Sequence, residues 1–429
     1  MKNIQYKTII PTTIGTSLEW AEYTFFAFMA DQLAGLFFTS DNPELARLKT
    51  YGIFATSYLI RPVGALLFGT IGDKIGRKPA LVSSMLLMCF ATTAIGFLPT
   101  YATLGTSAAF LLMFFRCLQG LAVSGEFNGA AVFMFEHHQQ RPFFAGSLTP
   151  FAAASGMSLG ALAATLVSLP NAPSFAWRIP FLCSGAIGLV ALYLRSKSAE
   201  TPIFAHAVTQ EKSTESLLLL IKQNLKAVLL TASLAILISV YINIGSVYYK
   251  ILSVQVGGLA PHLASEIVTI GQALASLSIL LFGVLANKTN GRKICLMGLG
   301  LTILFAPVIL SCGQSGSISV TLAGQFIYAL LNGMVSAPMM TLMVPLFKPQ
   351  IRFRGNALAW SIPAAIFGGT TLLVAQTLIN RFGFLGPGLY ISVVAAIAFF
   401  TLQWASKTSQ PNEAYQISVP LKLQNQSPP

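Results

Sequence analysis

The five longest stretches of this 429-residue chain that contain no Asp, Glu, Lys or Arg are 79–115, 142–177, 294–347, 355–380 and 382–406. A helix that spans a bilayer takes about 20 predominantly apolar residues, so the stretch 294–347 is long enough for two spans. Charged residues make up 9% of the whole chain, whereas ordinary soluble proteins have roughly 25%. We therefore predict an all-α integral membrane protein.

Charged residues and Gly, Pro and Asn turn signals divide the sequence into twelve predicted spans. Their approximate limits are 10–38, 50–71, 79–100, 108–135, 144–169, 178–195, 224–252, 263–286, 294–312, 318–346, 355–379 and 385–406. The longest polar connection separates the first six spans from the last six. We predict an N-terminal six-helix bundle over 1–195, a cytoplasmic linker over 196–222, a C-terminal six-helix bundle over 223–406, and a disordered cytoplasmic tail over 407–429.

The distribution of basic residues predicts the orientation. With the N-terminus in the cytoplasm, nineteen of the 26 Lys and Arg residues fall on the cytoplasmic side, and four fall opposite: Arg47, Lys49, Arg178 and Arg381. Basic residues concentrate on the cytoplasmic side of membrane proteins. We therefore predict a multi-pass protein of the bacterial inner membrane with both termini cytoplasmic. The net charge of +13 then orients helices, and we expect no nucleic-acid partner.

An internal repeat supports the division into two halves. GTIGDKIGRK begins at Gly69 and GVLANKTNGRK begins at Gly283, an offset of 214 in a chain of 429 residues. Parallel repeats related by an axis along the membrane normal are a known transporter architecture, with the solute site at the midplane between the halves. The repeat predicts two pseudo-symmetric six-helix bundles and a solute site between them.

Several segments, taken together, resemble the major facilitator superfamily. The loop after the second span is similar to that superfamily's signature loop. Further segments resemble its metabolite:proton symporter branch, which carries osmolytes, dicarboxylates, citrate and shikimate: LEWAEYTFF (18–26), LIRPVGALLFGTIGDKIGRK (59–78), RCLQGLAVSGEFNGA (116–130), WRIPF (177–181), ETPIF (200–204) and IRFRGNALAWSIPAAIFGG (351–369). The sequence departs from the branch at Ala21-Glu22, where an aromatic and Asp are usual, and at Trp360-Ser361, where an aromatic and Asn are usual.

The signature loop supplies the predicted gate, which consists of Asp73, Lys74, Arg77 and Lys78. An acid and bases at the ends of two helices can pair, hold one conformation and then release it. The alternative is a cluster that only anchors the topology. In the second copy Asn287 replaces the acid, so we expect a weaker latch there.

Ionisable residues inside apolar spans cost about 2.5–3.5 kcal/mol each on insertion scales, so each is a functional candidate. Glu19 and Glu22 share one face of the first span, Arg61 lies at a similar depth in the second, and Glu126 lies in the fourth. We predict that Glu22 or Glu126 carries a transported proton and that Glu19 and Arg61 tune it. The alternative is a structural ion pair that never titrates.

Neutral polar residues of the second half, together with Arg116 and Gln119 in the fourth span, are the predicted solute site. They are Tyr241, Asn243, Gln325, Tyr328, Asn332 and Trp360. In this interpretation the N-terminal half binds and releases protons, and the C-terminal half holds most of the solute. The alternative is that these polar side chains only join helices, as they often do in membranes.

These observations favour a monomeric secondary transporter that imports a small polar solute bearing a carboxylate together with a proton, by alternating access. The resemblance implies an organic acid, amino acid, zwitterion or citrate-type solute. An exporter or antiporter of a polar metabolite or siderophore is the first alternative, and a channel or a membrane enzyme is the second. The sequence has no His-Glu-x-x-His motif and no Cys/His metal cluster of the kind found in metal-dependent enzymes. The five cysteines lack metal-ligand spacing, so we predict no metal and no cofactor.

Overall fold

A computed structural model of the protein describes residues 6–38, 52–53, 56–167, 171–207 and 222–407. The elements of the first half are α1 (Tyr6–Phe28), α2 (Ala30–Phe37), α4 (Arg61–Lys74), α5 (Arg77–Phe97), α6 (Tyr101–Leu104), α7 (Thr106–His137), α8 (Pro142–Val167), α9 (Arg178–Ser196) and α10 (Pro202–Ala207). All of them are helical, and all of the regular structure in the covered ranges is helical.

The second half is a series of helices interrupted by short irregular turns. Its elements are α12 (Leu225–Asn243), η1 (Ile244–Tyr248), α13 (Tyr249–Gln255), α14 (Pro261–Lys288), α15 (Gly291–Gly313), α16 (Ile318–Met343), η2 (Val344–Leu346), η3 (Pro349–Ile351), α17 (Arg352–Pro363), η4 (Ala364–Gly368), α18 (Gly369–Phe382), η5 (Gly383–Leu385) and α19 (Gly386–Lys407).

The all-α membrane fold predicted from the sequence is confirmed. Within the described residues, 10 helices are long and apolar enough to cross a membrane. The remaining two of the twelve predicted spans correspond to α1 with α2 and to α4, which contain the buried ionisable residues Glu19, Glu22 and Arg61. The α4 helix has 14 residues and is shorter than a spanning helix, whereas α1 has 23 residues and contains two buried carboxylates, which lower its mean hydropathy. The predicted limits agree with the observed helices to within a few residues except in the second span, which was predicted over 50–71 and in which α4 begins at Arg61.

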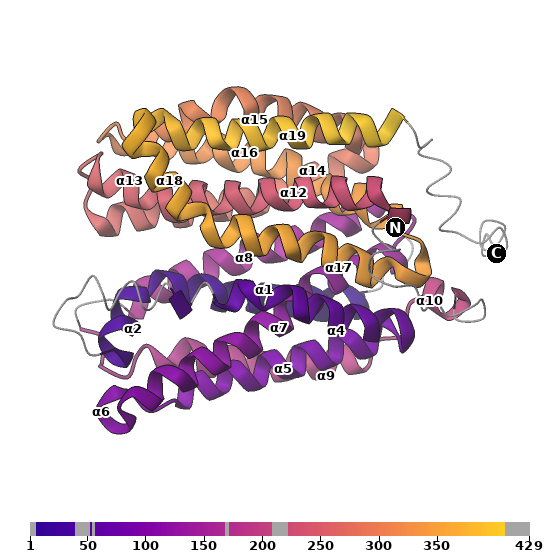
Figure 1. The fold of residues 1–429 in the computed structure, drawn as a ribbon, viewed down its shortest axis with the longest axis horizontal. Coiled ribbons are helices and arrows are strands. Elements are labelled where there is room, and N and C mark those ends of the chain that lie inside the picture. The colour runs from indigo at the N-terminus through magenta and orange to yellow at the C-terminus, as the bar shows by residue number, and fades with distance from the viewer. Residues whose placement is uncertain (1–5, 39–51, 54–55, 168–170, 208–221, 408–429) are drawn as a thin grey trace.

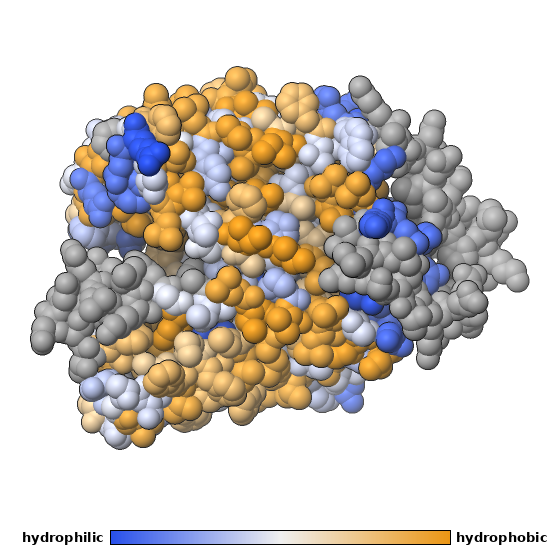
Figure 2. Space-filling model, viewed as in Figure 1, coloured by the Kyte–Doolittle hydropathy of each residue, from blue (hydrophilic) through white to orange (hydrophobic). Residues whose placement is uncertain are grey.

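Large apolar side chains are exposed on the outer surface of the bundle. Phe90 is 58% exposed in the first half, and Leu304 and Phe400 are 69% and 66% exposed in the second. Figure 2 shows this apolar surface as an orange band across the middle of the molecule, with blue hydrophilic residues toward the two ends. An exposed apolar band is the surface expected where the neighbouring medium is hydrocarbon rather than water.

Two layers of helices lie one above the other in Figure 1, with the early elements below and the late elements above. One end of the molecule carries the start of α1, the end of α19, and α10, and we name it the α10 end. The two layers meet where α4 packs against α17 and where α8 packs against α14. The division of the chain at the linker stays a prediction, because 208–221 lies outside the described residues.

The repeat places two glycines where the layers touch. A Cβ atom added to Gly69 of α4 would collide with the backbone of Arg354 in α17, and one added to Gly283 of α14 would collide with the Ser147 side chain of α8. A glycine therefore permits the close approach at both contacts. The sequence repeat thus corresponds to a repeat of helix contacts.

Candidate functional site

A cavity lies between the two layers, and we name it the central cavity. It contains about 560 Å³ of space not filled by protein atoms, part of it open to solvent, between α1, α4 and α8 on one side and α12, η1, α17 and η4 on the other. Its lining residues are Trp20, Tyr23, Thr24, Ala27, Phe28, Tyr58, Arg61, Met157, Ile238, Ser239, Ile242, Asn243, Ser246, Val247, Trp360 and Ala364. Most of these side chains are apolar or aromatic, and a few are polar, which is the usual composition of a small-molecule site.

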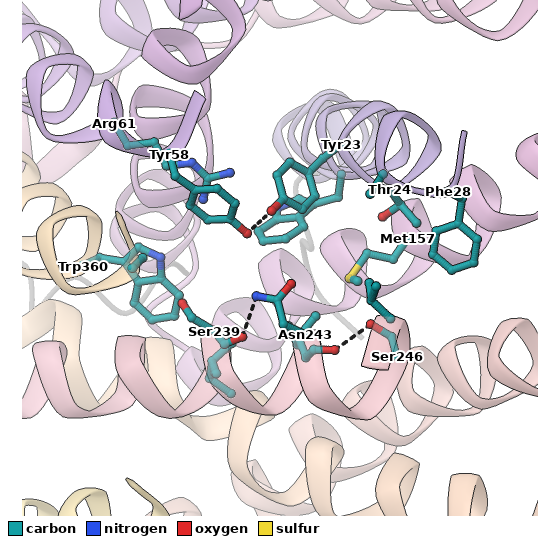
Figure 3. Close-up of a pocket in the computed structure, with 16 residues that line it drawn as sticks. Tyr23, Thr24, Phe28, Tyr58, Arg61, Met157, Ser239, Asn243, Ser246 and Trp360 are labelled. Atoms are coloured by element: carbon teal, nitrogen blue, oxygen red, sulfur yellow. Dashed lines mark hydrogen bonds between the residues drawn. The ribbon is translucent and has the colours of Figure 1, made fainter. Parts of the chain in front are cut away.

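The first-half wall of the central cavity combines aromatic rings with one cation. Tyr23 of α1 and Tyr58 point toward one another and are joined by a hydrogen bond between their hydroxyl groups (Figure 3). The Arg61 guanidinium carbon lies 4.1 Å from the Tyr58 ring centroid and 5.3 Å from that of Tyr23. Cation–π contacts of this kind hold the cation at an aromatic face. The wall therefore presents a positive charge beside the cavity.

The opposite wall is polar but uncharged. Asn243 of α12 donates a hydrogen bond from Nδ2 to the Ser239 carbonyl oxygen at 2.8 Å, and the Ser246 hydroxyl donates to the Ile242 carbonyl oxygen at 2.6 Å. Trp360 of α17 lies on the same side of the cavity (Figure 3). None of the described residues that line the central cavity is acidic. A positive group in this cavity would therefore have aromatic rings and oxygen dipoles as partners, but no carboxylate.

A second cavity, of about 240 Å³, lies inside the first half, and we name it the acidic cavity. Its lining residues are Glu19, Glu22, Tyr23, Ser57, Arg61, Met88, Arg116, Gln119, Gly120 and Val123. Tyr23 and Arg61 line both this cavity and the central one. These two side chains thus form part of the wall between the two cavities.

Glu22 is the centre of a hydrogen-bond network in the acidic cavity. Its carboxylate accepts from the Ser184 hydroxyl at 2.6 Å, from Gln119 Nε2 at 3.0 Å, and from the Thr92 hydroxyl. Arg116 donates to Gln119 Oε1 at 2.9 Å and so contacts Glu22 through the Gln119 amide. The network brings the predicted residues Arg116 and Gln119 to Glu22, away from the central cavity.

Glu126 occupies a different environment. Arg195 of α9 donates from Nη1 to both oxygens of the Glu126 carboxylate, at 2.6 and 2.5 Å. The two side chains are 3% and 1% exposed. Removing one member of such a buried pair leaves an uncompensated charge. Arg195 was not predicted from the sequence to be the partner of Glu126.

Glu19 has no comparable partner. It is 2% exposed, and neither of its carboxylate oxygens has a hydrogen bond to any described residue. The charges that act on it are those of Arg61, Arg195, Glu22 and Glu126. Buried polar groups are nearly always hydrogen-bonded, so this unpartnered carboxylate is exceptional.

The predicted solute residues of the second half separate into two groups. Asn243 and Trp360 line the central cavity, and Asn332 lines a further cavity of about 380 Å³ that also contains Trp360 and Gln272. The other three residues, Tyr241, Gln325 and Tyr328, are buried inside the second half. The Tyr241 and Tyr328 rings stack with their centroids 4.7 Å apart, and Gln325 Nε2 donates a hydrogen bond to the Gly245 carbonyl oxygen at 2.9 Å. A binding role for these three stays a prediction.

The predicted gate residue Asp73 joins the two layers at the α10 end. Its Oδ1 accepts from the Phe353 backbone N–H at 3.0 Å, and its Oδ2 accepts from the Arg354 N–H at 2.9 Å. Both N–H groups belong to the first turn of α17, where the helix supplies no partner for them. A carboxylate at this position also interacts favourably with the helix dipole. Asp73 of α4 is therefore a cap on a helix of the other layer.

The three basic residues of the signature loop differ in what they contact. Arg77 donates to Asp73 Oδ1 at 2.8 Å and to the Pro349 carbonyl oxygen at 2.5 Å, across the contact between the layers. The backbone N–H of Lys78 donates a hydrogen bond to the Glu200 carboxylate at 3.1 Å. The Lys74 side chain is exposed. Arg77 is thus the base that joins the layers.

Glu136, which was not predicted from the sequence, completes the latch. Its carboxylate accepts from Arg352 Nη1 at 3.0 Å, from Arg77 at 3.4 Å and from the Thr201 hydroxyl at 2.6 Å. The IRFRG and ETPIF segments that supply Arg352 and Thr201 were identified as family-like, but they pointed to no role. Together Asp73, Arg77, Glu136 and Arg352 form what we call the charged latch.

The repeat produces a second, uncharged latch. Asn287 Oδ1, at the end of α14, accepts from the Phe143 backbone N–H at 3.2 Å, in the first turn of α8. Close by, the Thr341 hydroxyl donates to the Pro142 carbonyl oxygen at 2.8 Å. Asn287 therefore caps α8 as Asp73 caps α17, but through one hydrogen bond and without a charge.

His138 follows α7 at the same end of the molecule. Burial, and then the neighbouring His137, lower the pKa of His138 to about 4. Its Nε2 lies 3.0 Å from the Thr8 hydroxyl. His138 is therefore neutral near pH 7, where it carries no charge for the latch.

Comparisons with known proteins agree on one family. A sequence model described as Major Facilitator Superfamily matches residues 23–361. A Staphylococcus aureus (strain COL) protein that carries a proline/betaine transporter name is 32% identical over 407 residues, which cover 92% of this chain and 87% of that protein. The proline/betaine transporter of Salmonella typhimurium (strain LT2) is 30% identical over 411 residues, which cover 92% of this chain and 82% of that protein.

A solved structure shares the fold. The proton:xylose symporter XylE, with a bound bromodeoxyglucose, superposes with a TM-score of 0.73 and covers 93% of this chain and 95% of the XylE chain. The sequence identity is 14%, so this similarity concerns the arrangement of helices alone.

Proposed function

The chain belongs to the major facilitator superfamily and is a membrane transporter of a small solute, and from that premise we propose that it imports a zwitterion together with a proton. The solute class that we propose carries a carboxylate and an alkylated ammonium group, as proline and glycine betaine do. The relatives with proline/betaine transporter names support this choice.

The composition of the central cavity is the observation that carries the proposal. Arg61 supplies a positive charge for a carboxylate, and a guanidinium binds carboxylates with two parallel hydrogen bonds. Trp20, Trp360 and Phe28 supply aromatic faces around the same space, and aromatic faces bind quaternary ammonium groups. A primary ammonium group would bring three N–H donors into a cavity with no described carboxylate. Alkylated ammonium groups, which have few or no N–H donors, therefore fit better.

The latches support transport by alternating access. Charged and neutral caps join the two layers at one end of the molecule, and the central cavity lies between the same layers. Breaking the caps would let the layers separate at the α10 end, and a solute held at the midplane would then face that side. Uptake by proton symport and a monomeric state remain parts of the proposal.

Transport by purified protein in liposomes tests the proposal. We expect labelled glycine betaine and labelled proline to accumulate when the outside is more acidic than the inside, and accumulation to stop when a protonophore dissipates the gradient. Unlabelled alanine, which has a primary ammonium group, should compete more weakly than betaine. Accumulation that ignores the proton gradient would exclude proton coupling, and failure of both solutes to enter would exclude the proposed solute class.

A further inference from the structure

The wall between the central and acidic cavities contains one cation that can interact with either side. Arg61 lines both cavities, its guanidinium is held at the Tyr58 and Tyr23 rings, and its buried Nε has no hydrogen-bond partner among the described residues. Arg61 makes no ion pair with any described residue. Cation–π contacts hold it without neutralising its charge.

Glu19 lies on the acidic-cavity side of this wall. A buried ionised carboxylate without hydrogen bonds is far more costly than its neutral form. Arg195, one of the two cations that act on Glu19, is already bound through both oxygens of Glu126. Arg61 is therefore the counter-charge on which an ionised Glu19 depends.

The other two carboxylates of the first half already have donors. Glu22 accepts from Ser184, Gln119 and Thr92, and Glu126 accepts from Arg195. A proton that arrives at Glu126 would weaken its ion pair with Arg195, and a proton that arrives at Glu22 would weaken the hydrogen bonds that its carboxylate accepts. At Glu19 a proton displaces nothing among the described residues, so Glu19 is the acid that can change its protonation state without dismantling its surroundings.

We propose that Glu19 carries the coupled proton and that Arg61 links this proton to the solute. A solute carboxylate that enters the central cavity pairs with Arg61, so Glu19 loses its counter-charge and takes a proton from the outer water. One O–H bond forms on the Glu19 carboxylate. It breaks on the other side of the membrane, when the solute leaves and Arg61 again neutralises Glu19.

The linkage works in both directions. Three guanidinium groups, those of Arg61, Arg116 and Arg195, are buried in the first half together with the three carboxylates of Glu19, Glu22 and Glu126. When Glu19 is neutral the set has one unbalanced positive charge, which favours an anionic group in the central cavity. Proton and solute thus raise each other's affinity by the same factor, as binding linkage requires.

This inference rests on the proposed function, and its test separates the two. Glycine betaine and proline are added to weakly buffered purified protein, and proton uptake is measured together with binding. We expect wild type to take up about one proton per bound solute, and Glu19→Gln to bind solute, take up no proton and exchange labelled solute without accumulating it. Glu266→Gln, which removes an exposed carboxylate of α14, is the matched control and should behave as wild type.

An infrared titration without any solute covers the case in which both solutes are the wrong class. The pH-dependent protonated-carboxyl absorbance should be smaller in Glu19→Gln than in wild type and Glu266→Gln, by the contribution of one buried carboxyl group. An absorbance change in folded Glu19→Gln that equals that of wild type overturns the assignment. Normal proton uptake or accumulation by Glu19→Gln would overturn it as well, whereas a wild type that ignores proton gradients would refute the proposed function instead.

Discussion

Glu19, Glu22 and Glu126 are the same residue type at buried positions of one helical bundle, yet each has different neighbours. Glu126 is paired with a guanidinium, Glu22 is surrounded by neutral donors, and Glu19 has no hydrogen-bond partner among the described residues. In sequence they could be ranked only by depth and by family resemblance. The partners that distinguish them, Arg195 and Ser184, come from α9, more than fifty residues away along the chain.

The pairing of Glu126 with Arg195 leads to a prediction about stability. Glu126→Gln leaves the buried Arg195 charge uncompensated and should destabilise the protein by about 3–5 kcal/mol. Replacing both residues together, as Glu126→Leu with Arg195→Met, should recover most of that loss because no unpaired charge remains. Thermal unfolding in detergent, followed by tryptophan fluorescence, measures both variants.

Transport assays on the same variants distinguish a structural role from a coupling role. The double variant should accumulate solute under a proton gradient once it folds. A stable double variant that exchanges solute but cannot accumulate it would instead return Glu126 to the coupling role predicted from the sequence.

At the scale of elements, the caps show how a sequence repeat becomes unequal chemistry. Asp73 accepts from two N–H groups of α17 and from Arg77, whereas Asn287 accepts from one N–H group of α8. A charge at a helix N-terminus adds about 0.3–1 kcal/mol, and up to about 2 kcal/mol in partly buried geometries. The weaker second latch stays a prediction, and this difference in contacts is its physical basis.

The two caps should therefore respond differently to substitution. Asp73→Asn should reduce the initial rate of transport by roughly tenfold, since it removes the charge from the cap and from the Arg77 pair. Asn287→Ala, which removes a single neutral hydrogen bond of about 1 kcal/mol, should cost much less. Initial uptake rates, normalised to the amount of protein in the membrane, decide the matter. Equal losses at the two positions would show that the charge of Asp73 does not control the gate.

The helices themselves were predictable, because long uncharged stretches leave few alternatives, but their rotation about their own axes was not. Along α16 the polar residues Gln325, Tyr328 and Asn332 form one stripe, yet Asn332 reaches a cavity while Tyr328 packs on Tyr241. Helices that are apolar on all sides give no signal for which face meets solvent, lipid or core. Glu136 was missed for a related reason, since its partners come from three separate segments.

At the scale of the whole molecule, the start of α1, the end of α19 and the charged latch all lie at the α10 end (Figure 1). We predict that this end is cytoplasmic, as the nineteen basic residues indicate. A reporter fused after residue 210, or a cysteine there labelled with an impermeant reagent in intact cells, should report the cytoplasm. A periplasmic signal would invert the layout and would place the latches on the outer face.

The charge on Asp73 also bears on what happens when the energy supply fails. Both latches lie at the α10 end and stabilise the same closure, to which the charge on Asp73 adds about 1–2 kcal/mol. With the α10 end in the cytoplasm, as we predict, this addition shifts the resting population toward the inward-closed state roughly five- to thirtyfold. An empty carrier in that state binds internal solute less often. We therefore expect a de-energised cell to lose its stored solute more slowly than it would without the charge on Asp73.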